Sequence, residues 1–120
     1  MKFLWTTISV SNVEESVAFY QDIVGLEVAS TFNNPDGTKI AFMGSGETTV
    51  ELIQHGHGKH ETIGKGISIG FEVASVEAKI NELKVKDVDV VAGPFFPVES
   101  IIFFYIEDPN GVRIQFVENR

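Results

Sequence analysis

The three histidines, the side chains best suited to hold a transition metal, fall within one short segment of this chain. They are spaced His-x-His-x-x-His as His55, His57 and His60, and neutral imidazole is a common metal ligand. The surrounding residues are rich in glycine and lack periodicity, which predicts a linker, where imidazoles lack the hydrogen bonds that fix a ligand's orientation. We interpret the segment as a solvated linker that acquires adventitious nickel or zinc. A relocated metal site is the alternative.

A second set of chemically capable side chains falls on predicted strands. In the four strands that open and close the two halves of the chain, one face is apolar and the opposite face is mixed. The mixed face comprises Trp5, Thr7 and Ser9; Thr49, Glu51 and Ile53; Ser68, Gly70 and Glu72; and Arg113, Gln115 and Val117. Its indole offers a stacking surface for a planar or cationic ligand. Its polar groups offer anchors, and no serine has a histidine at comparable strand depth to form a catalytic triad.

The elements that must position these side chains repeat in order. Strands are predicted over residues 3–10, 26–32, 38–43 and 48–54, and again over 66–73, 88–92, 101–106 and 112–118. A helix follows the first strand of each half: Asn12 caps one, with the stripe Val13, Val17, Tyr20 and Val24, and Ser75 caps the other, with Val76, Ile80 and Leu83. The fold class is therefore α+β. Two tandem βαβββ modules, 1–54 and 66–120, joined by a linker over 55–65, form an open, curled eight-stranded mixed sheet around a cleft, with the helices on its outer face.

The composition describes one ordinary globular domain, residues 1–120. Its hydrophobic content of 43% can supply a core, and no apolar run has the length of a membrane helix. The net charge of −8 argues against nucleic acid or an anionic membrane as a partner and weakly favours a basic ligand. With no cysteine there is no disulfide or thiolate ligand, and a cytoplasmic location is expected.

The closing residues carry a family resemblance. The run Phe104-Tyr105-Ile106-Glu107-Asp108-Pro109-Asn110-Gly111 continues into Val112-Arg113-Ile114-Gln115-Phe116 and predicts a hairpin, with Pro109 and Asn110 at the centre of its turn. Together with the segment 10–20 and Gly25-Leu26, it resembles the vicinal oxygen chelate superfamily of glyoxalase I, bleomycin and fosfomycin resistance proteins and extradiol dioxygenases. The resemblance covers essentially the whole chain. It implies that the cleft is the active site and that the protein is a homodimer.

The resemblance also implies where a divalent metal would be held. Metal-dependent members use one ligand from the first and one from the last strand of each module, usually His or Gln, Glu, His and Glu. Carried over position by position, these ligands fall on Trp5, Glu51, Ser68 and Gln115. An indole is no ligand, a neutral hydroxyl is a weak one, and an amide cannot act as the base that glyoxalase-type isomerisation requires. We therefore expect neither a metal nor any other cofactor.

The function predicted from these residues is binding of a small aromatic or cationic molecule without metal. The predicted ligand-binding residues are Trp5, Thr7, Glu51, Ser68, Arg113 and Gln115, and Glu51 is expected to pair with Arg113 or to accept a hydrogen bond from Ser68 or Gln115. The alternative is a lactoylglutathione-lyase-like or other lyase or isomerase, in which Glu51 is the catalytic base with or without a divalent metal. A third hypothesis is an interaction module whose cleft is empty and collapsed. For Trp5 itself, the alternative to a stacking surface is plain core packing.

Overall fold

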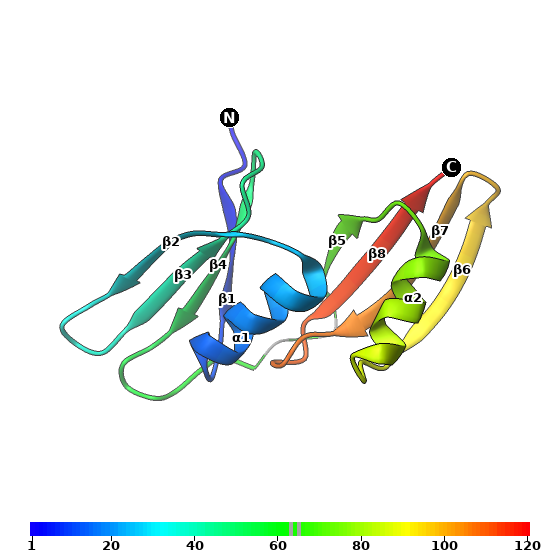
Figure 1. The fold of residues 1–120 in the computed structure, drawn as a ribbon. Helices are drawn as coiled ribbons and strands as arrows, with labels where there is room; N and C mark the ends of the chain where they lie inside the picture. Colours follow the sequence, from blue (N-terminus) through cyan, green and yellow to red (C-terminus); the bar gives the residue numbers. More distant parts are fainter. Residues whose placement is uncertain (63, 65) are drawn as a thin grey trace. The chain divides into compact units, whose positions relative to one another are not determined.

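The computed structural model describes residues 1–62, 64 and 66–120, so Ile63 and Lys65 of the predicted linker lie outside the described residues. The chain divides into two compact units, Met1–Thr62 and Ile63–Arg120, which we call module one and module two. Strands and helices follow the order βαβββ twice (Figure 1). The predicted α+β class and its duplication are confirmed, and the eight strands form two four-stranded sheets. The single-domain assignment and the cleft stay predictions.

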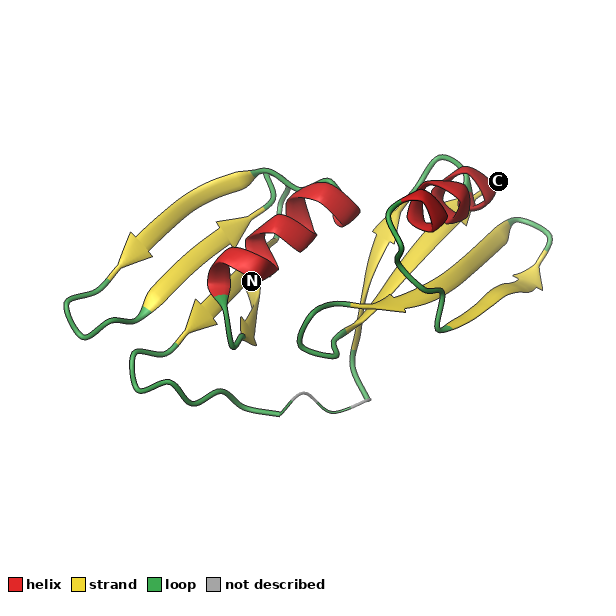
Figure 2. Ribbon diagram, turned by 60° about the horizontal axis from the view of Figure 1, so that its bottom comes forward, coloured by secondary structure: helices red, strands yellow, loops and turns green. Residues whose placement is uncertain are grey.

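Module one contains β1 (Trp5–Ser9), β2 (Val28–Asn33), β3 (Lys39–Met43) and β4 (Thr49–Gln54). Its sheet has the order β1-β4-β3-β2, with β1 parallel to β4 and the other neighbours antiparallel. The helix of this module lies across one face of its strands (Figure 2). On that face Ile8, Ala41 and Leu52 are buried, as the strand alternation predicts.

The first helix changes its geometry part-way along. It begins as α1 (Val13–Phe19), continues as the π-helical turn η1 (Tyr20–Val24) and ends at Gly25, whose φ of +88° suits glycine. The buried positions are Val13, Ser16, Tyr20 and Ile23, whereas Val17 and Val24 of the predicted stripe are half-buried. The wider π-helical turn shifts the phase of the residues that follow it.

Module two contains β5 (Ser68–Glu72), α2 (Val76–Val85), β6 (Ala92–Val98), β7 (Ile101–Glu107) and β8 (Arg113–Asn119). Its sheet has the order β5-β8-β7-β6, which repeats the topology of module one. Its core is formed by side chains of the last two strands and of α2, among them Leu83, Phe104, Ile106, Ile114 and Phe116. None of the described helices has the length and apolar character needed to cross a bilayer.

One predicted strand of module two was misplaced. The prediction over 88–92 followed a run of β-branched residues, whereas the strand is Ala92–Val98 and contains Pro94 and Pro97. Proline is tolerated there because β6 is the outer strand of its sheet, where fewer backbone donors are needed. Ile67 was also predicted on the apolar face, but it precedes β5 and is exposed.

The closing hairpin forms as the turn residues predict. Strands β7 and β8 pair antiparallel from Ile101↔Asn119 to Glu107↔Arg113. In the turn, the Gly111 N–H donates to the Asp108 carbonyl at 3.1 Å, which places Pro109 and Asn110 at the two central positions. The side chain of Asp108 is buried and accepts from the backbone N–H groups of Asn110 and Val112 at 2.8 and 2.9 Å. This turn fixes the start of β8, which carries Arg113 and Gln115.

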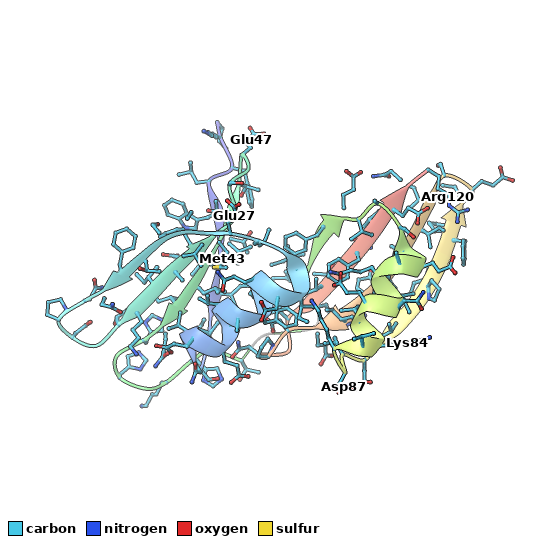
Figure 3. All side chains as sticks on the ribbon, viewed as in Figure 1. Glu27, Met43, Glu47, Lys84, Asp87 and Arg120 are labelled. Atoms are coloured by element: carbon cyan, nitrogen blue, oxygen red, sulfur yellow. The ribbon has the colours of Figure 1, made fainter. Side chains whose placement is uncertain are left out.

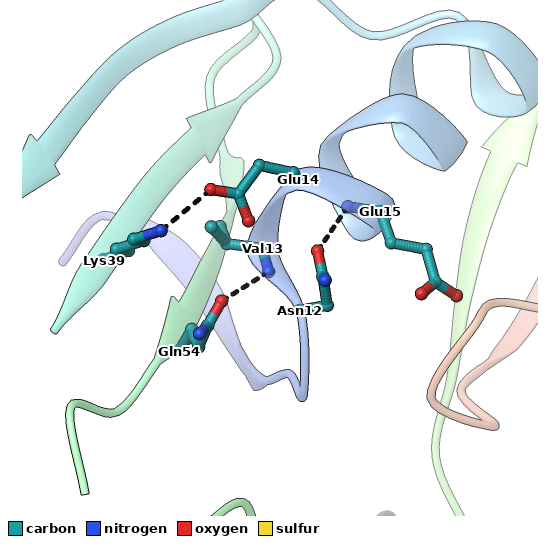
Figure 4. Close-up of polar contacts among 6 residues, drawn as sticks. All are labelled: Asn12, Val13, Glu14, Glu15, Lys39 and Gln54. Carbon is teal, nitrogen blue, oxygen red and sulfur yellow. Dashed lines mark hydrogen bonds and ion pairs between the residues drawn. The ribbon is translucent and has the colours of Figure 1, made fainter. Parts of the chain in front are cut away.

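The N-terminus of each helix is hydrogen-bonded to the strand that ends its module, β4 in module one and β8 in module two. In module one the Asn12 side chain accepts from the Glu15 N–H, and Gln54 Oε1 accepts from the Val13 N–H at 2.8 Å (Figure 4). In module two Glu118 Oε1 accepts from the Val76 N–H at 2.7 Å. These bonds satisfy donors at the helix N-terminus that have no partner within the helix. The same contact thus occurs in both modules, with an amide oxygen as the acceptor in module one and a carboxylate oxygen in module two.

We expect acid to loosen the helix anchor of module two and not that of module one. The Val76 N–H and then the Arg120 guanidinium hold the pKa of Glu118 below its usual range. A carboxyl whose pKa is lowered by folding contributes stability above its unfolded pKa, and this contribution is lost as the pH falls through the folded value. The free energy of unfolding of the wild type, measured with urea, should therefore fall relative to that of Glu118→Gln below about pH 4.3.

Module one supplies the matched control for this expectation. Gln54→Glu places a carboxylate at the equivalent contact and should introduce a new acid-dependent loss of stability. If the wild type and Glu118→Gln showed parallel pH profiles, the carboxylate at 118 would have no part in anchoring α2.

Candidate functional site

The predicted residues of module one lie together on the face of the sheet opposite α1. We call this the module-one face: Trp5, Thr7, Phe32, Phe42 and Glu51. In the strand register Thr7 is paired with Glu51 on one side, and Phe42 is paired with Glu51 on the other. The carboxylate is therefore flanked by a hydroxyl and by an aromatic ring.

Glu51 has a hydrogen-bond partner within module one that the sequence analysis did not anticipate. The Thr7 hydroxyl donates to Glu51 Oε1 at 2.6 Å, a short distance typical of a charge-assisted bond. The expected partners Arg113, Ser68 and Gln115 did not include Thr7, because residue alternation alone does not reveal that β1 pairs with β4. This bond orients the half-buried carboxylate of Glu51.

The indole of Trp5 is an exposed platform rather than a core side chain. It is 46% exposed, so the reading of Trp5 as plain core was wrong. Its ring lies 5.2 Å from that of Phe42 in a T-shaped contact, and Phe42 lies 6.1 Å from Phe32, which is 51% exposed. Sequence analysis missed both phenylalanines, although the alternation along residues 39–43 placed Phe42 on this side. The three rings form a row of aromatic surface beside Glu51.

The predicted residues of module two lie on the face of its sheet opposite α2. We call this the module-two face: Ser68, Phe95, Phe103, Tyr105, Arg113 and Gln115. The Gln115 amide donates to the Tyr105 hydroxyl at 3.2 Å, and the Arg113 guanidinium lies 5.3 Å from the centre of the Tyr105 ring. Ser68 is exposed and is paired with Arg113 in the register. Phe95 was missed because β6 was placed too early in the chain. Phe103 and Tyr105 lie on β7, which was predicted as a strand without assigning its residues to a face.

The side chains at the four family metal positions do not fit a divalent ion. Trp5 provides an indole, Ser68 a neutral hydroxyl, and the Gln115 amide nitrogen is engaged with Tyr105. Only Glu51 provides an anionic oxygen. Such a set lacks the imidazole and paired carboxylate donors that hold Mg²⁺, Mn²⁺, Ni²⁺ or Zn²⁺ in proteins.

The imidazole rings of the histidine segment contact their neighbours but do not converge on a position where a metal ion could bind. The rings of His55 and His57 stack 5.0 Å apart at an angle of 10°, and His57 Nδ1 accepts from the Lys59 N–H. Parallel rings direct their in-plane lone pairs side by side rather than toward a common ion. Across the described part of the chain, no three His, Asp or Glu side chains are arranged to hold a metal.

A groove in module two lies on the other side of its sheet. It has a volume of about 590 Å³ between α2 and β6, and its lining includes Ile80, Lys84, Phe96, Ile102 and Arg120. A smaller groove in module one, about 350 Å³, is lined by residues of α1 and β3. Neither groove is lined by a residue predicted to bind ligand. We therefore place candidate ligand contacts on the module-one face and on the module-two face, where the predicted side chains lie.

Comparison with known proteins settles the family. The model of the Glyoxalase/Bleomycin resistance protein/Dioxygenase superfamily matches residues 2–116. The chain belongs to this superfamily. A lactoylglutathione lyase of Haemophilus influenzae is 30% identical over the whole of this chain and 94% of its own, and one of Neisseria meningitidis is 30% identical over 92% of its own.

Solved structures share the fold of this chain at lower identity. The glyoxalase I of Leishmania major matches with a TM-score of 0.83 and 21% identity, covering 98% of this chain and 86% of that one. The antibiotic-binding protein TnmS3 of Streptomyces matches with a TM-score of 0.78 and 18% identity, covering all of this chain and 97% of that one. The same fold thus occurs in a glyoxalase and in an antibiotic-binding protein.

Proposed function

We propose that this superfamily member is a metal-independent binding protein for a small aromatic or cationic molecule, which it holds on the module-one face. The exposed Trp5 indole beside the Glu51 carboxylate is the observation that carries the proposal. The module-two face is proposed as a second ligand surface, with Ser68, Arg113 and Gln115 as its contacts. The protein acts as a homodimer in this proposal, which size-exclusion chromatography with light scattering will test.

The chemistry of the module-one face supports an aromatic or cationic ligand. Stacking of an aromatic ring on another contributes about 0.5–1.5 kcal/mol beyond the burial of its area, and a cation over an exposed indole contributes about 0.5–1 kcal/mol. Glu51 adds a negative charge within the same face, already oriented by Thr7. A ligand with a planar ring and a positive group would use both features at once.

A lyase or isomerase is the second candidate, and the lactoylglutathione lyases at 30% identity favour it. In that case Glu51 would act as general base, with or without a divalent metal. Two measurements separate the candidates. Protein purified without a histidine tag should contain no stoichiometric metal and should show no lactoylglutathione lyase activity. Stoichiometric metal, or lactoylglutathione lyase activity, that is present in the wild type and lost in Glu51→Gln would favour the lyase or isomerase over the binding protein.

Trp5 is the only tryptophan of the chain, so its fluorescence reports directly on the proposed site. We expect benzylamine to quench this fluorescence more strongly than the neutral benzyl alcohol, because only the amine pairs with Glu51. In Glu51→Gln the preference for benzylamine over benzyl alcohol should fall at least fivefold. This corresponds to about 1 kcal/mol, the contribution of one exposed charge pair. In Trp5→Leu, calorimetry should show at least tenfold weaker binding of both compounds.

The control for these variants is Phe96→Leu, which removes an exposed aromatic ring of module two from the groove beside α2. It should bind both compounds as the wild type does. If benzylamine and benzyl alcohol bound equally to the wild type, or if Trp5→Leu bound them unchanged, the module-one face would not be the binding site.

A further inference from the structure

Arg113 carries an unusual donor on the module-two face. Its side chain is half-buried, and its Nε is buried without a hydrogen-bond partner in the part of the chain that the structure describes. The guanidinium rests on the Tyr105 ring, with 5.3 Å between its carbon and the ring centre. A charged N–H group buried without an acceptor is costly, so this arginine is poised to gain from an incoming oxygen.

The acidic residues of the chain leave this arginine unpaired, although acids outnumber bases by 17 to 9. The ion pairs among the described residues join Lys39 to Glu14, Lys79 and Lys86 to Glu82, and Arg120 to Glu118. Glu107 lies opposite Arg113 in the β7–β8 register and is exposed, yet the guanidinium lies over Tyr105. Glu72, on β5, accepts a hydrogen bond from Asn119.

Residue 115 is a glutamine, so its neutral amide places no negative charge beside Arg113. It lies two residues along β8, on the same face, and its amide donates to the Tyr105 hydroxyl. A Cβ at Gly70 would lie 3.2 Å from Gln115 Oε1, so the glycine leaves room for this amide. A carboxylate at position 115 would lie beside the guanidinium and compete with any anion from solution.

Aromatic side chains continue the surface beyond Tyr105. Phe103 lies 5.7 Å from Tyr105, and Phe95 lies 5.4 Å from Phe103, measured between ring centres. Phe95 is 43% exposed. A ligand whose anionic group meets Arg113 would therefore find an apolar aromatic surface next to that contact.

We infer that the module-two face binds an aromatic monocarboxylate of the benzoate type, with its carboxylate on Arg113 and its ring against Tyr105, Phe103 and Phe95. The planar guanidinium matches a carboxylate with two parallel hydrogen bonds. A single positive charge suits a monoanion better than a phosphate dianion. This inference deepens the proposed function by naming a ligand class for the module-two face. It rests on the proposed ligand contacts Arg113 and Gln115 and requires neither Trp5 nor Glu51.

Calorimetric titration with sodium benzoate, benzamide and inorganic phosphate tests the inference. We expect saturable binding of benzoate that is at least tenfold tighter than that of benzamide or of phosphate. Arg113→Gln should weaken benzoate at least tenfold, Arg113→Lys should weaken it less, and Gln115→Glu should weaken it at least fivefold by placing a competing carboxylate beside Arg113. Glu107→Gln should bind benzoate at least as tightly as the wild type.

Arg120→Gln is the matched control, since Arg120 follows β8 at the end of the chain and is already paired with Glu118 (Figure 3). It should leave benzoate binding unchanged. Should Arg113→Gln fail to fold by circular dichroism, Arg113→Lys and Gln115→Glu carry the test. The inference would be overturned by either of two results on the wild type: no saturable benzoate binding, or binding of benzamide or phosphate as tight as that of benzoate. Unchanged affinity in the Arg113 variants would also overturn it. Trp5→Leu should retain benzoate binding, so failure of the module-one proposal is seen separately.

Discussion

Replacing Asp108 by alanine is expected to lower the free energy of unfolding by about 3 kcal/mol. The Asp108 carboxylate is buried and accepts from two backbone N–H groups, those of Asn110 and Val112. A hydrogen bond to a charged group contributes about 1.5–3 kcal/mol, and a buried donor left without an acceptor is costly in addition. Urea denaturation followed by circular dichroism measures the change.

Two variants show whether the loss comes from this carboxylate. Asp108→Asn keeps one oxygen acceptor and should be less destabilising than Asp108→Ala. In module one, Asp36 accepts from the Thr38 N–H in an exposed turn, so Asp36→Ala should also be the milder change. Equal losses in Asp108→Ala and Asp36→Ala would mean that burial adds nothing at position 108.

Gly56→Ala is expected to lower the free energy of unfolding by about 2–3 kcal/mol, the cost of overpacking at a tight contact. A Cβ at this position would collide with the backbone oxygen of Asp36 and lie 2.9 Å from its carbonyl carbon. The contact cannot be relieved by turning a side chain, because both groups are backbone. The Gly56 N–H also donates to Thr38 Oγ1, so a displaced chain would lose that bond.

The measurement for Gly56→Ala is again urea denaturation, with Gly46→Ala as the matched control. A Cβ at Gly46 would meet nothing nearer than the Thr48 carbonyl oxygen at 3.9 Å, which is ordinary van der Waals contact. We expect Gly46→Ala to be near neutral. A similarly small effect of Gly56→Ala would show that the 34–38 turn and the 54–58 segment separate readily.

Features that depend on neighbouring residues could be predicted from the sequence. Asn12 and Ser75 were correctly identified as helix caps, and each accepts from the N–H three residues later. The Pro109-Asn110 turn was predicted for the same reason, since its conformation depends on the dihedral preferences of its own residues. Turn and cap chemistry is local, so it needs no knowledge of distant strands.

Features that depend on tertiary context were predicted less well. β6 was placed too early because the run Val88–Val91 has strand-like composition, whereas the strand itself contains two prolines. Proline in a strand is tolerated at the outer position that β6 occupies, and that position is known only once the sheet has formed. The exposure of Ile67 likewise follows from its place ahead of β5, which strand alternation alone does not show.

The duplicated α+β fold and the faces on which Trp5, Glu51, Ser68, Arg113 and Gln115 lie could be predicted from the sequence, since strand alternation and turn chemistry are encoded residue by residue. Tertiary structure decided which side chains meet on those faces. Thr7 reaches Glu51, and Arg113 rests on Tyr105, because strands distant in the chain pair in a particular register. Register depends on burying the apolar faces of all four strands of a sheet together, so no single segment specifies it.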